Sequence, residues 1–294
     1  MVVLVTGATG FLGRHLLKHL AGKKERVRCL ARKTSNVDFI DRKKFDLVFG
    51  DITNMQSLLG ATKDVSMVIN LAASVSGDVR ELNSVNVAGT KNLVEACRQN
   101  NVKRIIHISS LATTREPLDE YGKTKLEADK MVMESGLKWT ILRPTMIYGE
   151  GSSAQKMLAS YVNAIPFIIP IIGSGNYKVM PVYVEDVCSA IAGAEAAGRQ
   201  VDGKIYDIAG PDKITFNHMI SIFCKELGIR KIMVHVPVPL CLAAAKILSA
   251  LPGFPLKESF IKSINNDTRA EPAPAIKDLS FNPADFEKGI KLAI

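Results

Sequence analysis

Short apolar runs alternate with amphipathic segments along the first half of the chain. The β-branched and aliphatic runs show little polar alternation and lie at residues 2–5, 27–30, 46–50, 67–72, 104–109 and 139–144. The segments between them repeat apolar residues at intervals of three and four, as at residues 12–20, 89–100 and 122–135. These patterns predict parallel strands covered on both faces by helices, which is the doubly wound α/β (Rossmann) class.

The alternation becomes irregular after about residue 149. A proline-rich apolar stretch at residues 164–175 is followed by strand signals near 179–187 and 204–210, and by a helix that Thr215 is expected to cap. We expect Asp186 to cap a further helix that starts at Val187. The pattern indicates a Rossmann domain over residues 1–148, to which 177–208 return. Residues 149–176 and 209–294 then form a smaller, partly interleaved C-terminal substrate lobe.

The hydrophobic content and the cysteine usage indicate a globular protein in a reducing compartment. The 294 residues are 47% hydrophobic, enough for a large core. The five cysteines are scattered, with neither a CxxC pair nor a histidine close by in sequence, so we expect buried thiols, no metal site and a cytoplasmic location. The N-terminus lacks a basic region followed by an apolar stretch, and no signal peptide is expected.

The net charge of +9 and the longest apolar stretch both bear on partners. Lysines and arginines are spread along the chain without interleaved aromatic residues, which favours a solvated surface over a nucleic-acid site. The stretch at residues 236–254 is interrupted by prolines and Lys246, so it is too short to span a bilayer. It favours a core or cap helix over a membrane-surface contact, and leaves peripheral membrane or protein-complex association open.

Three glycines follow the first strand and precede a helix, in the sequence TGATGFLG. Gly7 permits a tight turn, Gly10 removes a Cβ that would collide with a ligand, and Gly13 lets the helix pack on the strand. This arrangement gathers free backbone N–H groups at the positive end of a helix dipole. It predicts a site for the pyrophosphate of a dinucleotide.

The end of the second strand indicates which dinucleotide. NAD sites commonly place an acidic residue here for the ribose hydroxyls, whereas this chain has Arg32 and Lys33. Since a guanidinium can bind a phosphate through two hydrogen bonds, NADP(H) is favoured, with NAD(H) left open. Asp51 ends a later strand, in a position to accept a hydrogen bond from the adenine amino group.

Several motifs together resemble a known family. TGATGFLG, GDIT, NLAA, NVAGTKNLVEA, ISS, YGKTK, LRPTMIYG and VYVEDV are similar to signatures of the extended and atypical short-chain dehydrogenase/reductases, also called the NAD-dependent epimerase/dehydratase family. Residues 165–187 and 235–240 resemble the atypical branch that includes the NADPH-binding accessory subunit of respiratory complex I and its bacterial relatives. The resemblance runs over residues 2–290. It implies a dinucleotide site formed by Gly7, Thr9, Gly10, Phe11, Leu12, Gly13, Arg32, Lys33, Asp51, Ile52, Leu71, Ala72, Ala73, Asn86, Ser109, Tyr121, Lys125, Pro144, Thr145, Met146 and Ile147.

Tyr121 and Lys125 lie four residues apart in a helical segment, so their side chains share one face. A phenol with a pKa of about 10 is a poor base at neutral pH, but a nearby ammonium group and an oxidised nicotinamide both favour the phenolate. Tyr121 can then exchange a proton with a substrate oxygen. The resemblance adds Ser110, which orients that oxygen, and implies a catalytic set of Ser110, Tyr121 and Lys125.

We therefore expect an NADP(H)-dependent oxidoreductase or epimerase acting on a small hydroxyl or carbonyl substrate, as a monomer or homodimer. One alternative is a non-catalytic NADPH-binding structural or assembly protein similar to the complex I subunit. Another is a nucleotide-sugar epimerase or dehydratase. Against the latter, Ser110 and Tyr121 are closer in sequence than in such enzymes, and Lys178 stands near the position where they carry an arginine. A redox sensor of the nitrogen-regulator type would lack the tyrosine.

Overall fold

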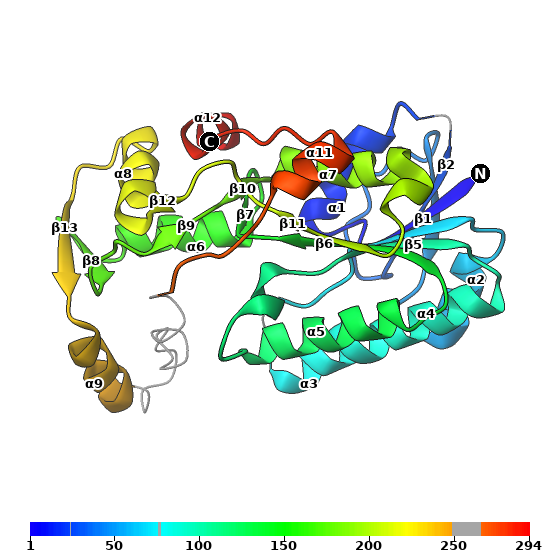
Figure 1. Cartoon of the computed structure of the whole chain (residues 1–294), viewed down its shortest axis with the longest axis horizontal. Helices are drawn as coiled ribbons and strands as arrows, with labels where there is room; N and C mark the ends of the chain where they lie inside the picture. Colours follow the sequence, from blue (N-terminus) through cyan, green and yellow to red (C-terminus); the bar gives the residue numbers. More distant parts are fainter. Residues whose placement is uncertain (24, 76–77, 249–265) are drawn as a thin grey trace. The chain divides into compact units, whose positions relative to one another are not determined.

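The computed structural model describes residues 1–23, 25–75, 78–248 and 266–294 (Figure 1). The end of the apolar stretch at residues 236–254 therefore lies outside the described residues. The chain divides into two compact units. The first unit consists of Met1–Pro144, Val184–Ile208 and Glu271–Asn282, and the second of Thr145–Tyr183, Ala209–Ala270 and Pro283–Ile294.

A seven-stranded parallel sheet forms the centre of the first unit, in the order β11-β6-β5-β4-β1-β2-β3 (Figure 1). Val3 of the central strand pairs with Val27 on one side and Met67 on the other. The strand order reverses direction between β1 and β4, where doubly wound sheets bind ligands beyond the strand ends. This topology confirms the predicted fold class. The strands are β1 (Val2–Thr6), β2 (Arg26–Ala31), β3 (Phe45–Phe49), β4 (Met67–Asn70), β5 (Arg104–Ile108), β6 (Lys138–Pro144) and β11 (Lys204–Ile208).

Helices cover both faces of this sheet. Figure 1 shows α2, α4 and α5 together on one face and α1, α7 and α11 on the other. Leu93 and Cys97 of α4 are buried in one cluster with Ile105 of β5 and Ile141 of β6. Burial of each leucine or isoleucine side chain stabilises the fold by roughly 1.5–3 kcal/mol. The helices are α1 (Phe11–Leu20), α2 (Met55–Thr62), α3 (Val79–Leu82), α4 (Gly89–Gln99), α5 (Glu120–Met133), α7 (Val184–Ala197) and α11 (Ala273–Leu279).

The division of the chain differs from the expected domain boundaries. The first boundary lies after Pro144 rather than residue 148, and Glu271–Asn282 belongs to the first unit although we expected all of 209–294 in the second. Asp278 of α11 accepts hydrogen bonds from Lys204 and Tyr206 of β11, at 2.8 and 2.6 Å. These contacts join the late segment to the edge strand, a pairing that local sequence patterns do not reveal.

The start of α7 also differs from expectation. Strand β9 (Lys178–Val179) and β10 (Val182–Tyr183) are short, and α7 begins directly at Val184. Asp186 therefore lies in the first turn beside Glu185 rather than at the N-cap, and that prediction was wrong. Carboxylates in a first turn interact favourably with the helix dipole.

The second unit has a core of its own, in which Tyr148, Ile171, Phe216, Phe223 and Ile290 are buried together. Its short strands pair as β7 with β10, β8 with β13, and β9 with β12. The predicted cap of α8 is confirmed. The remaining elements are α6 (Ser153–Asn163), β7 (Ile147–Tyr148), β8 (Ile168–Ile172), β12 (Ile214–Thr215), α8 (Phe216–Glu226), β13 (Ile232–Val236), α9 (Val238–Leu248) and α12 (Phe286–Ala293).

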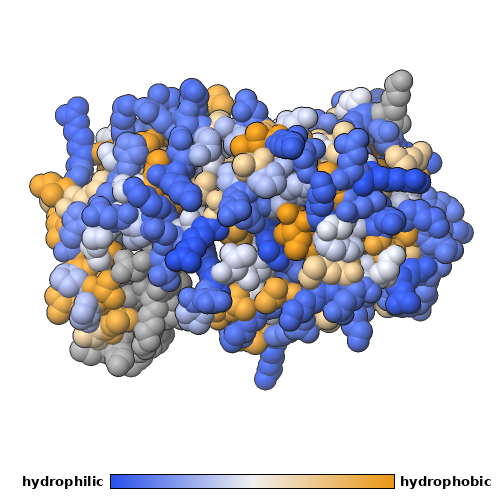
Figure 2. All heavy atoms as spheres, in the orientation of Figure 1, coloured by the Kyte–Doolittle hydropathy of each residue, from blue (hydrophilic) through white to orange (hydrophobic). Residues whose placement is uncertain are grey.

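Apolar side chains are exposed on part of the second unit. Phe167, Ile232, Val234 and Leu240 belong to or flank β8, β13 and α9, and Figure 2 shows hydrophobic surface over these elements. Helix α9 has 11 residues. Within the part of the chain that the structure describes, no helix is both long and apolar enough to cross a bilayer.

Candidate active site

The glycine turn between β1 and α1 has the geometry of a phosphate cradle. Gly7 has a φ of 67°, and a Cβ there would lie 2.8 Å from the backbone of Leu71 and Ala72. A Cβ at Gly13 would collide with the carbonyl oxygens of Gly7 and Ala8. These two glycines are required by the packing of the protein itself.

Gly10 is constrained much less by the protein. A Cβ at this position would meet only the Gly7 carbonyl oxygen within 4 Å, at 3.2 Å. Gly10 is also the N-cap of α1 and supplies no side-chain cap. No N-cap side chain therefore occupies the N-terminal end of α1, where a helix presents free N–H groups, and the turn fits a pyrophosphate.

The loop after β4 adjoins this turn. The amide of Leu71 donates to the Thr6 carbonyl oxygen at 3.3 Å, and the amide of Ala72 donates to the Thr6 hydroxyl at 3.4 Å. Ala73, the next residue, is exposed. Three of the residues expected in the dinucleotide site thus follow the neighbouring strand at the point where the strand order reverses.

The residues expected at the adenosine end lie in two loops. Arg32 and Lys33 are exposed directly after β2. The Oδ1 of Asp51 accepts hydrogen bonds from the amide and hydroxyl of Thr53, at 2.9 and 2.8 Å, so this oxygen stabilises its own turn. Ile52 is buried against Gly89, the first residue of α4.

Arg14 is a cation that sequence reasoning missed. Its Nε donates to the Thr9 carbonyl oxygen at 3.2 Å, and its guanidinium lies 4.3 Å from the centre of the Phe39 ring. Phe39 belongs to the loop that follows Arg32, so Arg14 links the glycine turn to that loop. Its position directly after Gly13 is the sequence signal that could have identified it.

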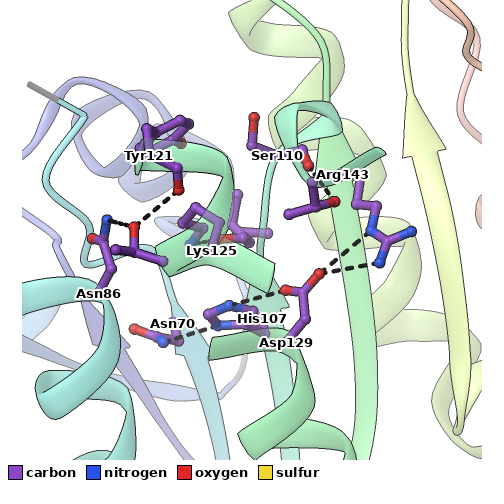
Figure 3. A network of polar contacts seen from close by, with 11 residues as sticks. Asn70, Asn86, His107, Ser110, Tyr121, Lys125, Asp129 and Arg143 are labelled. Carbon is purple, nitrogen blue, oxygen red and sulfur yellow. Dashed lines mark hydrogen bonds and ion pairs between the residues drawn. The ribbon is translucent and has the colours of Figure 1, made fainter. Parts of the chain in front are cut away.

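The expected catalytic residues come from the end of β5 and the start of α5. Ser110 follows β5, and its hydroxyl accepts a hydrogen bond from the Ala112 amide at 3.1 Å. Tyr121 lies in the first turn of α5 and Lys125 one turn later. Lys125 is only 1% exposed, and its Nζ donates to the carbonyl oxygen of Ile108, the last residue of β5, at 2.8 Å (Figure 3).

Burial shifts the pKa values of both titratable groups. It lowers the pKa of Lys125 from 10.5 to about 8, although the negative charge of Asp129 acts in the opposite direction. It raises the pKa of the Tyr121 phenol, and hydrogen bonding with the Ser110 side chain partly opposes this. Tyr121 is therefore a neutral phenol at pH 7, able to donate a proton.

A buried polar network lies beneath these residues, and sequence reasoning did not find it. The Thr6 hydroxyl donates to Asn70 Oδ1 at 2.6 Å, and Asn70 Nδ2 donates to His107 Nδ1 at 3.0 Å. His107 Nε2 lies 3.6 Å from Asp129 Oδ1, and Arg143 binds Asp129 Oδ2 through Nε and Nη2. Figure 3 shows Asn70, His107 and Arg143, which come from β4, β5 and β6, directed toward one another and toward Asp129 of α5.

The surroundings of His107 decide its protonation state. Burial, and secondarily the charge of Lys125, lower the pKa of His107 well below its usual value, so its imidazole is neutral. With Nδ1 accepting from Asn70, the proton of His107 resides on Nε2 and faces Asp129. Burial raises the pKa of Asp129, and contacts with Ser109, Lys125 and Arg143 oppose the rise.

Asn86 lies in a π-helical turn that precedes α4, at Asn83–Ala88. Its Oδ1 accepts from the Ser74 amide at 2.9 Å, and its Nδ2 donates to the Ser74 carbonyl oxygen and the Thr124 hydroxyl, both at 3.0 Å. The side chain thus ties the loop after β4 to α5. Its expected contact with the nicotinamide stays a prediction.

The remaining expected residues fall in both units. Ser109 is buried and its amide donates to Leu142 at 2.8 Å, and Pro144 ends β6. Thr145, Met146 and Ile147 belong to the second unit. The Oγ1 of Thr145 donates to the Met180 carbonyl oxygen at 2.5 Å. Their role in dinucleotide binding stays a prediction.

The family model for the NAD-dependent epimerase/dehydratase family matches residues 3–209. The chain belongs to this family. The resemblance inferred from the motifs is thereby confirmed, and membership groups the chain with NAD(P)-dependent oxidoreductases and epimerases. The family binds a nicotinamide dinucleotide, in agreement with the cradle at Gly7–Gly13.

Relatives within the epimerase/dehydratase family differ in their named activities. A sterol demethylase protein B of Methylococcus capsulatus is 33% identical over 171 residues, covering 51% of this chain and 52% of the relative, so the chain spans about half the length of that protein. A ceramide reductase of Caulobacter vibrioides is 28% identical, covering 85% and 78%. The mitochondrial NADH dehydrogenase (ubiquinone) 1 alpha subcomplex subunit 9 of Arabidopsis thaliana is 27% identical, covering 83% and 62%.

Solved structures share the fold. The UDP-glucuronic acid 4-epimerase of Bacillus cereus, in complex with NAD, superposes with a TM-score of 0.77 at 21% sequence identity, covering 99% of this chain and 97% of that chain. At this identity the likeness concerns the fold alone.

Proposed function

We propose that the protein is an NADP(H)-dependent oxidoreductase that interconverts a hydroxyl and a carbonyl group on an apolar substrate, using Ser110, Tyr121 and Lys125. The observation that carries this proposal is the burial of Lys125. This residue lies on α5, one helical turn after Tyr121, and its ammonium group donates to the carbonyl oxygen at the end of β5. Removing an ammonium group from water is unfavourable, so a purely structural position would favour an apolar residue. A lysine at this buried position indicates a role for its charge.

The cofactor supplies or accepts the hydride when bound. In the direction of reduction, the Tyr121 phenol donates its proton to the substrate oxygen, for which its raised pKa suits it. Ser110 holds that oxygen by a hydrogen bond. Lys125, protonated at pH 7, favours the phenolate left on Tyr121. In the reverse direction Tyr121 starts as the phenolate, which the charge of Lys125 favours, and takes the proton from the substrate hydroxyl.

The preference for NADP(H) rests on the cations near the end of β2. Arg32 and Lys33 are exposed there, no acidic residue takes their place, and Arg14 approaches the same loop through Phe39. Because a charged hydrogen bond contributes about 1.5–3 kcal/mol, Arg32→Ala should weaken NADPH binding about tenfold or more and NADH binding little. Arg98→Ala, which removes an exposed arginine from α4, is the matched control. Equal weakening of both dinucleotides would contradict the assignment.

An apolar substrate is supported by the second unit and by two relatives. Phe167, Ile232 and Leu240 expose apolar surface, and the relatives named above are called a sterol demethylase protein and a ceramide reductase. A nucleotide sugar is the alternative, and Lys178 offers it a single point charge rather than a guanidinium. NADPH oxidation reports the reduction of a panel of keto-lipids, whereas chromatography of UDP-glucose and UDP-glucuronic acid after incubation with the protein and NAD reports epimerisation, which consumes no dinucleotide; together the two assays separate the two substrate classes.

A non-catalytic role similar to that of a complex I subunit is the second candidate, favoured by the 27% identical relative from Arabidopsis. Tyr121→Phe distinguishes it from an enzyme. We expect the variant to bind NADPH within a few-fold of the wild type, measured by calorimetry, and to lose about 10²–10⁴-fold in turnover. Tight NADPH binding by the wild type without turnover of any substrate in the panel would favour the structural role.

A further inference from the structure

Four side chains with metal-binding groups meet between α1 and α7, apart from the candidate active site. His15 and His19 lie one helical turn apart on α1, and Glu185 and Cys188 lie one turn apart on α7. Glu185 Oε1 is 2.5 Å from His15 Nδ1, and Oε2 is 2.6 Å from His19 Nε2. One ligand atom each from His19, Glu185 and Cys188 lie within 4.8 Å of one another.

We propose that His15, His19, Glu185 and Cys188 form a tetrahedral zinc site that joins α1 to α7. Two imidazoles, a carboxylate and a thiolate are ligand types that zinc prefers. Zinc bond lengths place neighbouring ligand atoms roughly 3.3–3.8 Å apart. The two histidine–carboxylate contacts, at 2.5 and 2.6 Å, are shorter than this, so they open by about 1 Å when the ion enters.

The surroundings suit a structural metal. Cys188 is fully buried and the His15 side chain is 8% exposed, whereas those of His19 and Glu185 are 28% and 30% exposed. Two ligands therefore come from the interior, and two face the solvent from which an ion arrives. The Phe11 ring packs edge-on against His15, with ring centres 5.4 Å apart.

Binding of Zn²⁺ to these four side chains balances in both charge and protons. The thiol of Cys188 releases one proton, and each imidazole moves its N–H to the ring nitrogen that faces away from the metal. The carboxylate and the thiolate then neutralise the two charges of Zn²⁺, so no net charge is buried. Four protein ligands leave no open position, and the site is structural rather than catalytic.

Hydrogen bonds alone explain only part of the cluster. A Glu185 carboxylate between two N–H donors accounts for the two histidines, but it gives no role to Cys188. The thiol is the group that distinguishes a zinc site from a histidine–glutamate clamp. The decisive experiment therefore reports on the sulfur.

Cobalt(II) titration of the tag-free, reduced full-length protein is that experiment. We expect one Co²⁺ per chain, the visible bands of a tetrahedral site, a near-ultraviolet thiolate-to-cobalt charge-transfer band, and loss of both when zinc is added. Cys188→Ala should lose the charge-transfer band, and His19→Gln should weaken binding at least tenfold. Cys224→Ala, which removes another buried thiol from α8, should behave as the wild type.

The proposal is overturned if the wild type shows no charge-transfer band, or if the band persists in Cys188→Ala. Visible bands without charge transfer would mean that the metal binds only the histidines and the carboxylate, which also overturns it. Circular dichroism in the presence of a chelator verifies that each variant is folded, and Cys188→Ser replaces Cys188→Ala if the latter does not fold. The readout is independent of dinucleotide binding and of turnover.

Discussion

Replacing Lys125 with methionine removes a buried ammonium group and keeps most of the length of the side chain. Burial lowers the pKa of Lys125 from 10.5 to about 8, and this difference corresponds to about 3 kcal/mol of free energy that disfavours the charged form in the folded protein. The variant also loses the hydrogen bond to the Ile108 carbonyl oxygen, which costs about 1–2 kcal/mol. We expect Lys125→Met to raise the free energy of unfolding at pH 7 by about 1–2 kcal/mol.

The same shift predicts how this gain depends on pH. Between about pH 8 and 10.5, the unfolded chain keeps a proton on Lys125 that the folded protein has released. The free energy of unfolding of the wild type therefore rises with pH in this window, relative to the variant. The difference between the two should shrink above pH 8 and reverse its sign by about pH 10.

Urea unfolding at pH 7, 8, 9 and 10 measures this difference. Trp139, the only tryptophan of the chain, lies in β6 and packs against the core of the first unit, so its fluorescence reports on that unit. Lys123→Met is the matched control, since Lys123 lies on the same helix with 57% of its side chain exposed. A difference between the wild type and Lys125→Met that stays constant from pH 7 to 10 would refute the reasoning.

Three further changes test the packing and the cradle. Gly193→Ala should lower the free energy of unfolding by roughly 1–3 kcal/mol, because a Cβ there collides with the Leu279 carbonyl group; Gly60→Ala, where no atom lies within 4 Å of the added Cβ, should not destabilise the protein. Urea unfolding read by tryptophan fluorescence compares them. Thr215→Ala should cost about 1 kcal/mol through loss of the N-cap of α8, seen as a lower urea midpoint by circular dichroism. Gly10→Val should abolish binding of NADPH and NADH in calorimetry and leave the protein folded, and normal binding would contradict the phosphate-turn assignment.

The first 144 residues show how far local patterns reach. All six expected strands form, with ends that shift by one or two residues, because a buried parallel strand needs an unbroken apolar run. The tight turn that the Gly10 amide closes on the Gly7 carbonyl oxygen and the cap at Thr215 depend on contacts within a few residues, and both were predictable for that reason. The approach of Leu71 and Ala72 to Gly7 comes from tertiary structure. The start of α7 at Val184 was not, since strand and helix propensities overlap there.

The sequence by itself therefore determined the fold class, the glycine turn between β1 and α1, and the spacing that places Tyr121 and Lys125 on one helical face. Tertiary structure alone decided the pKa values of these two side chains. A pKa depends on removal from water and on charges that arrive from other elements, as Asp129 and His107 do beside Lys125. The same holds for the return of α11 to the first unit, and for the meeting of His15 with Glu185 across 170 residues, because contacts between distant segments leave no periodic trace in the chain.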